Sequence, residues 1–153
     1  MNKTVLCLSV ALLSAPAVRA QSLPSRPEVG VQVAVGLSGS NEFGLGGRVR
    51  YPFRLTAPAP IAAQADLNWF PSHTSVVDVN WNLVFNFIPR GSARPYAGGG
   101  INVLLGGGAS HPVGLNGVGG FEFGRLGQLT PYLEGRYTFF SLDAIIVTFG
   151  VRF

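Results

Sequence analysis

Cysteine, lysine and long apolar runs are almost absent from this chain, and each absence excludes a class of structure or of binding site. The only cysteine, Cys7, lies in a segment that we expect to be cleaved off, so the mature chain has no disulfide and no thiolate metal site. No stretch offers the roughly 20 consecutive apolar residues that a membrane-spanning helix needs. Two isolated histidines, His73 and His111, make a poor metal site. We therefore expect neither a bound metal nor another cofactor.

Charged residues are also scarce. They make up 12% of the chain, about half the usual share of roughly 25%. Apolar residues, at 47%, are as common as in an ordinary domain. Something other than water must therefore face much of the surface.

The first twenty residues have the pattern of a secretory signal. Lys3 precedes an apolar core over residues 5–13, and Val18-Arg19-Ala20 precedes Gln21, which predicts cleavage after Ala20. Removal of Lys3 and Arg19 from the eleven Lys and Arg leaves nine Arg against seven acidic residues, a formal charge of +2. These arginines are scattered singly, so we expect no nucleic-acid partner. The expected organisation is a signal peptide (1–20), a short polar lead-in (21–27) and one barrel domain (28–153).

Apolar and polar residues alternate with a period of two along most of the mature chain, which is typical of strands with two unlike faces. In the clearest run, Val77, Val79 and Trp81 oppose Asp78 and Asn80. Turn residues separate eight such runs, each near the roughly 9 to 11 residues of a strand that crosses a bilayer. The runs are 29–38, 43–53, 61–70, 77–87, 96–105, 115–123, 131–140 and 144–153.

Aromatic residues close every second run. The closing residues Phe53, Phe87, Phe123 and Phe153 lie 34, 36 and 30 residues apart, which is the length of two strands and two turns. Each sits at one end of its strand, where a ring can lie at the lipid headgroup boundary as part of an aromatic girdle. The sequence therefore predicts an all-β fold, an eight-stranded antiparallel up-and-down transmembrane β-barrel.

The polar face indicates which side is inside. A solvated exterior is rich in Lys and Glu, whereas this face carries Gly, Asn, Thr and a few charges of both signs, as a narrow, packed lumen does. The predicted lumen charge network has four basic and four acidic members: Arg48, Arg50, Asp66, Asp78, Glu122, Glu134, Arg136 and Arg152.

Buried charges need partners, so we expect these residues to pair. Arg48 and Asp66 each lie five residues from the same end of adjacent strands and should face each other. Arg152 should reach Glu28 just ahead of the first strand. We expect the network to fill the lumen and not to form a permanent aqueous pore.

Glycine, with 21 residues, is well above its usual frequency of about 7%. Much of it lies within the predicted strands, where it allows a large side chain of a neighbouring strand to lie against bare backbone. Tyr96 and Tyr132, if they point inward, are candidates for such packing.

Both ends of the predicted barrel lie on the same side, because the strand number is even, and in this class of barrel that side is periplasmic. The outer connections are then 39–42, 71–75, 106–114 and 141–143. All four are short, which disfavours an adhesin or a receptor for another protein.

The chain resembles the small eight-stranded outer-membrane barrels, the group of the OmpA transmembrane domain and OmpX. The resemblance rests on Arg94-Pro95-Tyr96-Ala97-Gly98-Gly99-Gly100 and on the terminal alternation that ends at Phe153. It implies a structural protein of the cell outer membrane, monomeric, with outer-membrane lipids and lipopolysaccharide around it. It also implies that the barrel-assembly machinery reads the last strand through Phe153.

Two other functions stay open beside the structural one. Some barrels of similar size resemble lipid A deacylases, which use a His-x-Ser pair with an acidic helper, and His73-Thr74-Ser75 has that spacing, with Asp78 or Asp143 as conceivable partners. The pair lies in a short turn and not within a late strand, so we expect no enzyme. The third function is a narrow channel of low conductance.

Overall fold

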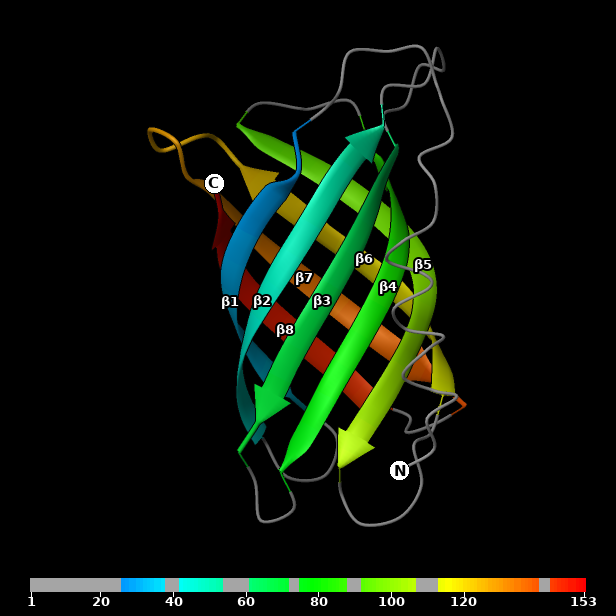
Figure 1. Ribbon diagram of the computed structural model, residues 1–153. Helices are drawn as coiled ribbons and strands as arrows, with labels where there is room; N and C mark the ends of the chain where they lie inside the picture. Colours follow the sequence, from blue (N-terminus) through cyan, green and yellow to red (C-terminus); the bar gives the residue numbers. More distant parts are fainter. Residues whose placement is uncertain are drawn as a thin grey trace.

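The computed structural model describes residues 26–37, 42–53, 61–71, 75–87, 92–106, 113–140 and 144–153. These residues form one closed antiparallel barrel in which each strand pairs with its neighbours in sequence (Figure 1). The strands are β1 (Glu28–Gly36), β2 (Glu42–Phe53), β3 (Ile61–Phe70), β4 (Val76–Asn86), β5 (Ala93–Gly106), β6 (Val113–Phe123), β7 (Thr130–Phe139) and β8 (Ala144–Arg152). The predicted eight-stranded, up-and-down architecture is confirmed.

Pairing of β1 with β8 closes the barrel. The register runs from Gly30 opposite Arg152 to Gly36 opposite Ile146. Next to the pair Gly30–Arg152, Val29 N donates to Phe153 O at 3.2 Å, and Phe153 N donates to Val29 O at 2.9 Å. Every strand thus has a partner on both sides, as hydrocarbon requires of a sheet. We call the end where β1 begins and β8 ends the inner end, and the opposite end the outer end.

The strand bounds agree with the predicted runs within a few residues, and the largest difference is at β5. This strand begins at Ala93, three residues before the predicted start, because Ala93 and Arg94 pair with Phe123 and Glu122 on β6. Pro95 does not end the strand. Its carbonyl accepts a hydrogen bond of 2.9 Å from Phe87 N, a contact that needs no N–H from proline.

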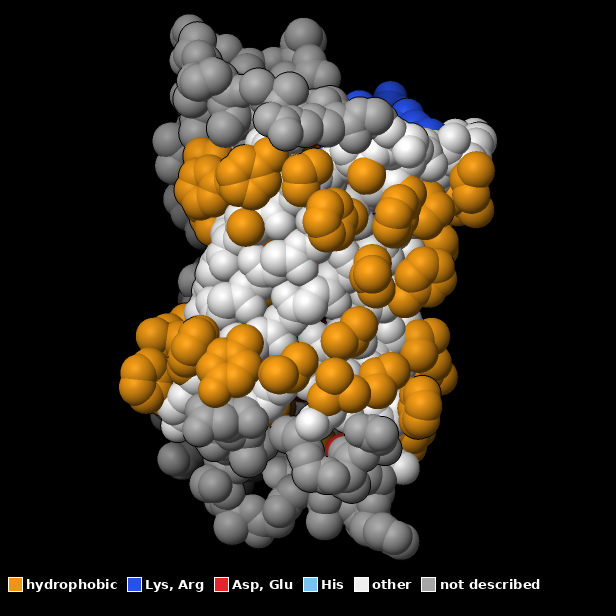
Figure 2. All heavy atoms as spheres, turned by 180° about the vertical axis from the view of Figure 1, so that it is seen from behind, with side chains coloured by type: hydrophobic (Ala, Val, Ile, Leu, Met, Phe, Trp, Pro, Cys, Tyr) orange, Lys and Arg blue, Asp and Glu red, His pale blue; other side chains and the backbone are white. Residues whose placement is uncertain are grey.

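Side-chain direction follows residue number throughout the eight strands, because the alternation continues in phase from strand to strand. Even-numbered side chains point into the lumen and odd-numbered ones point outward. Outward Val31 and Leu67 are 57% and 51% exposed although they are apolar. On the face of the barrel that Figure 2 shows, hydrophobic side chains gather mainly toward each end. The apolar face is therefore the exterior, as predicted from the composition of the polar face.

The four aromatic residues of the predicted girdle lie together at the inner end. Phe53 and Phe123 are the last residues of β2 and β6, and Phe87 and Phe153 directly follow β4 and β8. All four are exposed, by 37% to 60%. Their contact with lipid headgroups stays a prediction.

Several predicted features lie outside the described residues. These are the signal peptide 1–20, lead-in residues 21–25, His73, His111, Asp143 and most of the connecting loops. In the part of the chain that the structure describes, no helix is long and apolar enough to span a bilayer.

Replacement of Val79 by Arg tests which face meets lipid. Val79 lies outward in β4 between Leu67 and Val103, so its charge would enter the hydrocarbon. We expect the free energy of unfolding, measured by urea titration in lipid vesicles, to fall by about 2 to 4 kcal/mol.

Val113→Arg is the matched control for depth, since Val113 lies outward at the first position of β6 and is 62% exposed. It should cost only about 0 to 1 kcal/mol. Equal losses at both positions would contradict a hydrocarbon belt around the barrel.

Candidate functional site

All eight residues of the predicted charge network point into the lumen. None is more than 9% exposed. They come from β2, β3, β4, β6, β7 and β8, and the structure brings them into three groups along the barrel axis. We call these the inner, central and outer groups.

Arg48 holds the central group together. It lies directly opposite Asp66 in the β2–β3 register, and its Nε donates to Asp66 Oδ1 at 2.5 Å. Its Nη2 crosses the lumen to Glu134 Oε1 on β7 at 2.6 Å. One guanidinium thus pairs with two carboxylates, which leaves a formal charge of −1 on the three side chains, and its planar fork suits this double contact.

Neutral side chains complete the hydrogen bonding of the two central carboxylates. Gln64 Nε2 donates to Asp66 Oδ2 at 3.0 Å and to Glu134 Oε2 at 2.9 Å. The Tyr96 hydroxyl donates to the same Glu134 oxygen at 2.9 Å. The buried acids therefore have both charge and hydrogen-bond partners, which burial of a charge demands.

The inner group links the first and last strands of the barrel. Arg152 contacts Glu122 Oε1 at 2.8 Å and Glu28 Oε2 at 2.9 Å. Arg50 pairs with the same Glu122 and donates to Asn86. This group thus connects β1, β2, β4, β6 and β8 near the inner end, where the four phenylalanines of the predicted aromatic girdle lie.

The outer group has only two charged members, and amides and a threonine complete it. Arg136 on β7 pairs with Asp78 on β4, across the lumen. Asn80 Nδ2 also donates to Asp78 Oδ2, at 2.9 Å. Asn116 Nδ2 donates to Asn80 Oδ1 at 2.9 Å, and Thr138 Oγ1 donates to Asn116 Oδ1 at 3.1 Å.

Sequence reasoning identified only part of this pairing. The expected Arg48–Asp66 and Arg152–Glu28 contacts are present. The bonds from Arg48 to Glu134, from Arg50 to Glu122 and from Arg136 to Asp78 were missed, because each joins strands that are not adjacent. The buried amides were missed as partners as well, although their even numbers place them on the lumen face: Gln32, Gln64, Asn68, Asn80, Asn82, Asn102 and Asn116.

Two tyrosines pack against glycine in the lumen, as predicted. Tyr96 lies opposite Gly120, where an added Cβ would be 2.7 Å from the Tyr96 ring and hydroxyl. Tyr132 lies opposite Gly150, where an added Cβ would be 2.4 Å from its hydroxyl oxygen. The Arg48 guanidinium carbon lies 4.3 Å from the centre of the Tyr132 ring, within cation–π range. The glycines thus position the rings that surround the arginines.

The residues considered for catalysis are not assembled in the described chain. Ser75 is exposed just before β4, while Asp78 is buried and bonded to Arg136. His73 and Asp143 lie outside the described residues. Among the described residues no group of three or more His, Cys, Asp or Glu has the proximity of metal ligands.

Solved structures with the same architecture were found, although no family model and no curated protein sequence matches the chain. A designed transmembrane β-barrel gives a TM-score of 0.61 at 15% identity, over 86% of this chain and 97% of that chain. The N-terminal β-barrel domain of Pseudomonas aeruginosa OprF gives 0.56 at 12% identity, over 82% and 97%. Neisserial surface protein A gives 0.54 at 14% identity, over 82% and 94%.

The chain has the fold of the small eight-stranded outer-membrane β-barrels. The similarity covers nearly the whole length of each of these proteins. A match to the outer membrane enzyme PagL, with a TM-score of 0.45, is too weak to carry an argument about activity.

Alanine at Gly120 or Gly150 should destabilise this outer-membrane barrel fold by displacing a tyrosine ring. The added methyl group meets both the ring and a backbone oxygen, so overpacking should lower the free energy of unfolding by about 1 to 3 kcal/mol. Gly119→Ala is the matched control, since the nearest atom to its added Cβ is 3.9 Å away. Urea titration in vesicles measures all three, and a loss in Gly119→Ala as large as in Gly120→Ala would refute the packing argument.

Removal of the Arg48 charge alone should cost more than removal of the whole central charge group. Arg48→Met leaves Asp66 and Glu134 buried without a cation, which we expect to cost about 3 to 5 kcal/mol of unfolding free energy. Arg48→Met combined with Asp66→Asn and Glu134→Gln removes all three charges and should restore most of that loss. If the triple variant is less stable than Arg48→Met, the cost comes from packing and not from unpaired charge.

Proposed function

We propose that this protein is a monomeric, integral outer-membrane β-barrel with a structural role in the envelope and without catalysis. Its lumen is filled by side chains and closed to ions. The outward apolar faces of all eight strands support residence in a bilayer. The fold, which it shares with outer-membrane barrels, supports the outer membrane as the location.

The closed lumen is supported above all by the central group. Arg48 bridges from β2 to Asp66 on β3 and to Glu134 on β7, so it crosses the interior. The inner group spans the interior a second time, through Arg50, Arg152 and Glu122. An eight-stranded barrel is only just wide enough to be filled by such side chains.

The partners we propose are the lipids around the exterior, lipopolysaccharide in the outer leaflet, and the barrel-assembly machinery. The last strand supports the third of these, because Phe149, Val151 and Phe153 alternate outward at its end. The side chain of Phe153 is 60% exposed on the outside of the closed barrel.

A narrow channel is the second candidate, and one observation favours it. Within the described lumen, buried polar atoms without a hydrogen-bond partner occur in more than one group, among them Gln64 Oε1, Asn82 Nδ2 and Arg136 Nε. Buried polar atoms of this kind are commonly bound by water. A continuous file of such sites would carry ions.

Conductance in planar bilayers distinguishes the two candidates. The wild-type protein should give no current steps, because ion pairs cross the lumen in all three groups. Arg48→Ala removes the central bridge and leaves two carboxylates, so it should give small cation-selective steps, and Val49→Ala on the outward face should remain silent. Regular steps from wild-type protein would favour the channel. Gel migration of unboiled and boiled samples verifies that each variant is folded.

A deacylase is tested separately by mass spectrometry of lipid A from cells with and without the protein. We expect an unchanged acyl pattern. Loss of one acyl chain in cells with the protein, and its return in Ser75→Ala, would identify an enzyme instead.

A further inference from the structure

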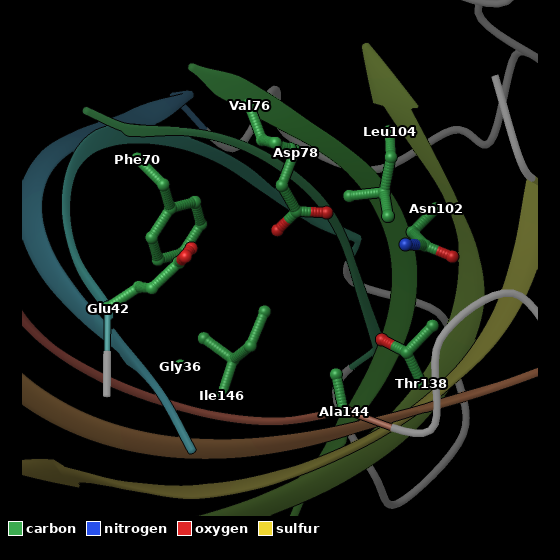
Figure 3. A pocket seen from close by; sticks show the side chains of 10 residues that line it. All are labelled: Gly36, Glu42, Phe70, Val76, Asp78, Asn102, Leu104, Thr138, Ala144 and Ile146. Carbon is green, nitrogen blue, oxygen red and sulfur yellow. The ribbon is translucent and has the colours of Figure 1, made fainter. Parts of the chain in front are cut away.

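A cavity of about 110 Å³ lies at the outer end of the barrel, beyond the outer group. We call it the outer cavity. Its lining includes Glu42, Phe70, Asp78, Asn102, Leu104 and Ile146, so side chains of β2, β3, β4, β5 and β8 surround it. Figure 3 shows these side chains arranged around a common space. Its walls are largely apolar, whereas the inner and central groups consist mostly of charged and polar side chains.

The apolar part of the lining can take a hydrocarbon group. Phe70 and Ile146 are 6% and 8% exposed and pack together with Ala34. Leu104 and Val76 extend the apolar wall around the cavity. For scale, an apolar cavity of about 150 Å³ binds benzene, so this one fits a chain of roughly four carbons.

Asp78 gives the cavity an acceptor without a donor. Its three hydrogen bonds, from Asn68, Asn80 and Arg136, all end on Oδ2. Oδ1 has no partner although Asp78 is fully buried. Figure 3 shows this carboxylate directed into the space between the lining side chains. A buried carboxylate oxygen without a donor is unfavourable, so a ligand that donates here is stabilised.

Glu42 adds a second negative charge to the lining. It is half-buried at the start of β2, and none of the described residues forms an ion pair with it. Arg136 neutralises only one of the two carboxylates, Asp78. The described side chains around the cavity, with Arg136 included, therefore have a net charge of −1, which favours a cation.

We infer that the outer cavity binds a small primary alkylammonium ion. The ammonium group, which has three N–H donors and no acceptor, donates to Asp78 Oδ1 and is paired with Glu42. The alkyl chain packs against Phe70, Leu104 and Ile146. This binding goes beyond the structural function and does not depend on it.

The test is an NMR titration of the folded full barrel in zwitterionic detergent micelles with n-butylammonium chloride. We expect saturable shifts of the backbone amides of Asp78, Asn102 and Ile146. Two probes of similar size serve as controls: n-butanol should bind at least tenfold more weakly, and sodium pentanoate should not bind. Equal binding of butanol, or no saturable shift with butylammonium, would overturn the inference.

Two variants locate the site. Glu42→Gln should weaken butylammonium binding by about fivefold, the usual size of one partly solvated charge interaction. Ala144→Leu should abolish binding because the larger side chain fills the cavity. Glu28→Gln makes the same charge change at the inner end and should leave binding unchanged.

The same variants detect uptake of the probe by the detergent. Shifts confined to outward-facing residues, or equal weakening in Glu28→Gln and Glu42→Gln, would mean that the cation meets the surface and not the cavity. Either result would contradict the inference.

Discussion

Closure of β1 onto β8 is the constraint on which the rest of this structure depends. In hydrocarbon an unpaired strand edge has no water to bind, so the sheet is stable there only as a closed cylinder. Closure in turn divides every strand into two environments. Outward side chains meet lipid and are apolar, and inward side chains meet each other in a space too narrow for bulk water.

The narrow interior explains why the lumen charges are arranged in groups. A cation such as Arg48 has no solvent to stabilise it, so it is held by Asp66 and Glu134. The amides and tyrosines around these charges provide the hydrogen bonds that water would otherwise supply. Glycines opposite Tyr96 and Tyr132 make the room for the rings. The two tyrosines, the glycines opposite them and the Arg48 ion pairs therefore pack against one another in the central part of the lumen.

Most of the fold could be predicted from the sequence because its signal is local. Alternation with a period of two needs only neighbouring residues, and it gave the strands, the faces and the up-and-down order. Contacts between adjacent strands, such as Arg48 with Asp66, followed from counting along two strands. Contacts across the interior did not, because the link from Arg136 to Asp78 depends on the curvature and tilt of the whole cylinder. The outer cavity was missed for the same reason, since its lining comes from strands that are far apart in the chain.

The double contact of Arg48 also bears on how the barrel comes apart. If only hydrogen bonds between neighbouring strands held the barrel together, its hairpins could separate one after another. Arg48 connects β2 with β7, which lies on the far side of the cylinder, so a hairpin that leaves must first expose a buried cation and two anions. Separation of β2 from its neighbours is thereby coupled to loss of the contacts that Arg48 makes with β7. We therefore expect this domain to unfold cooperatively, with few partly opened forms.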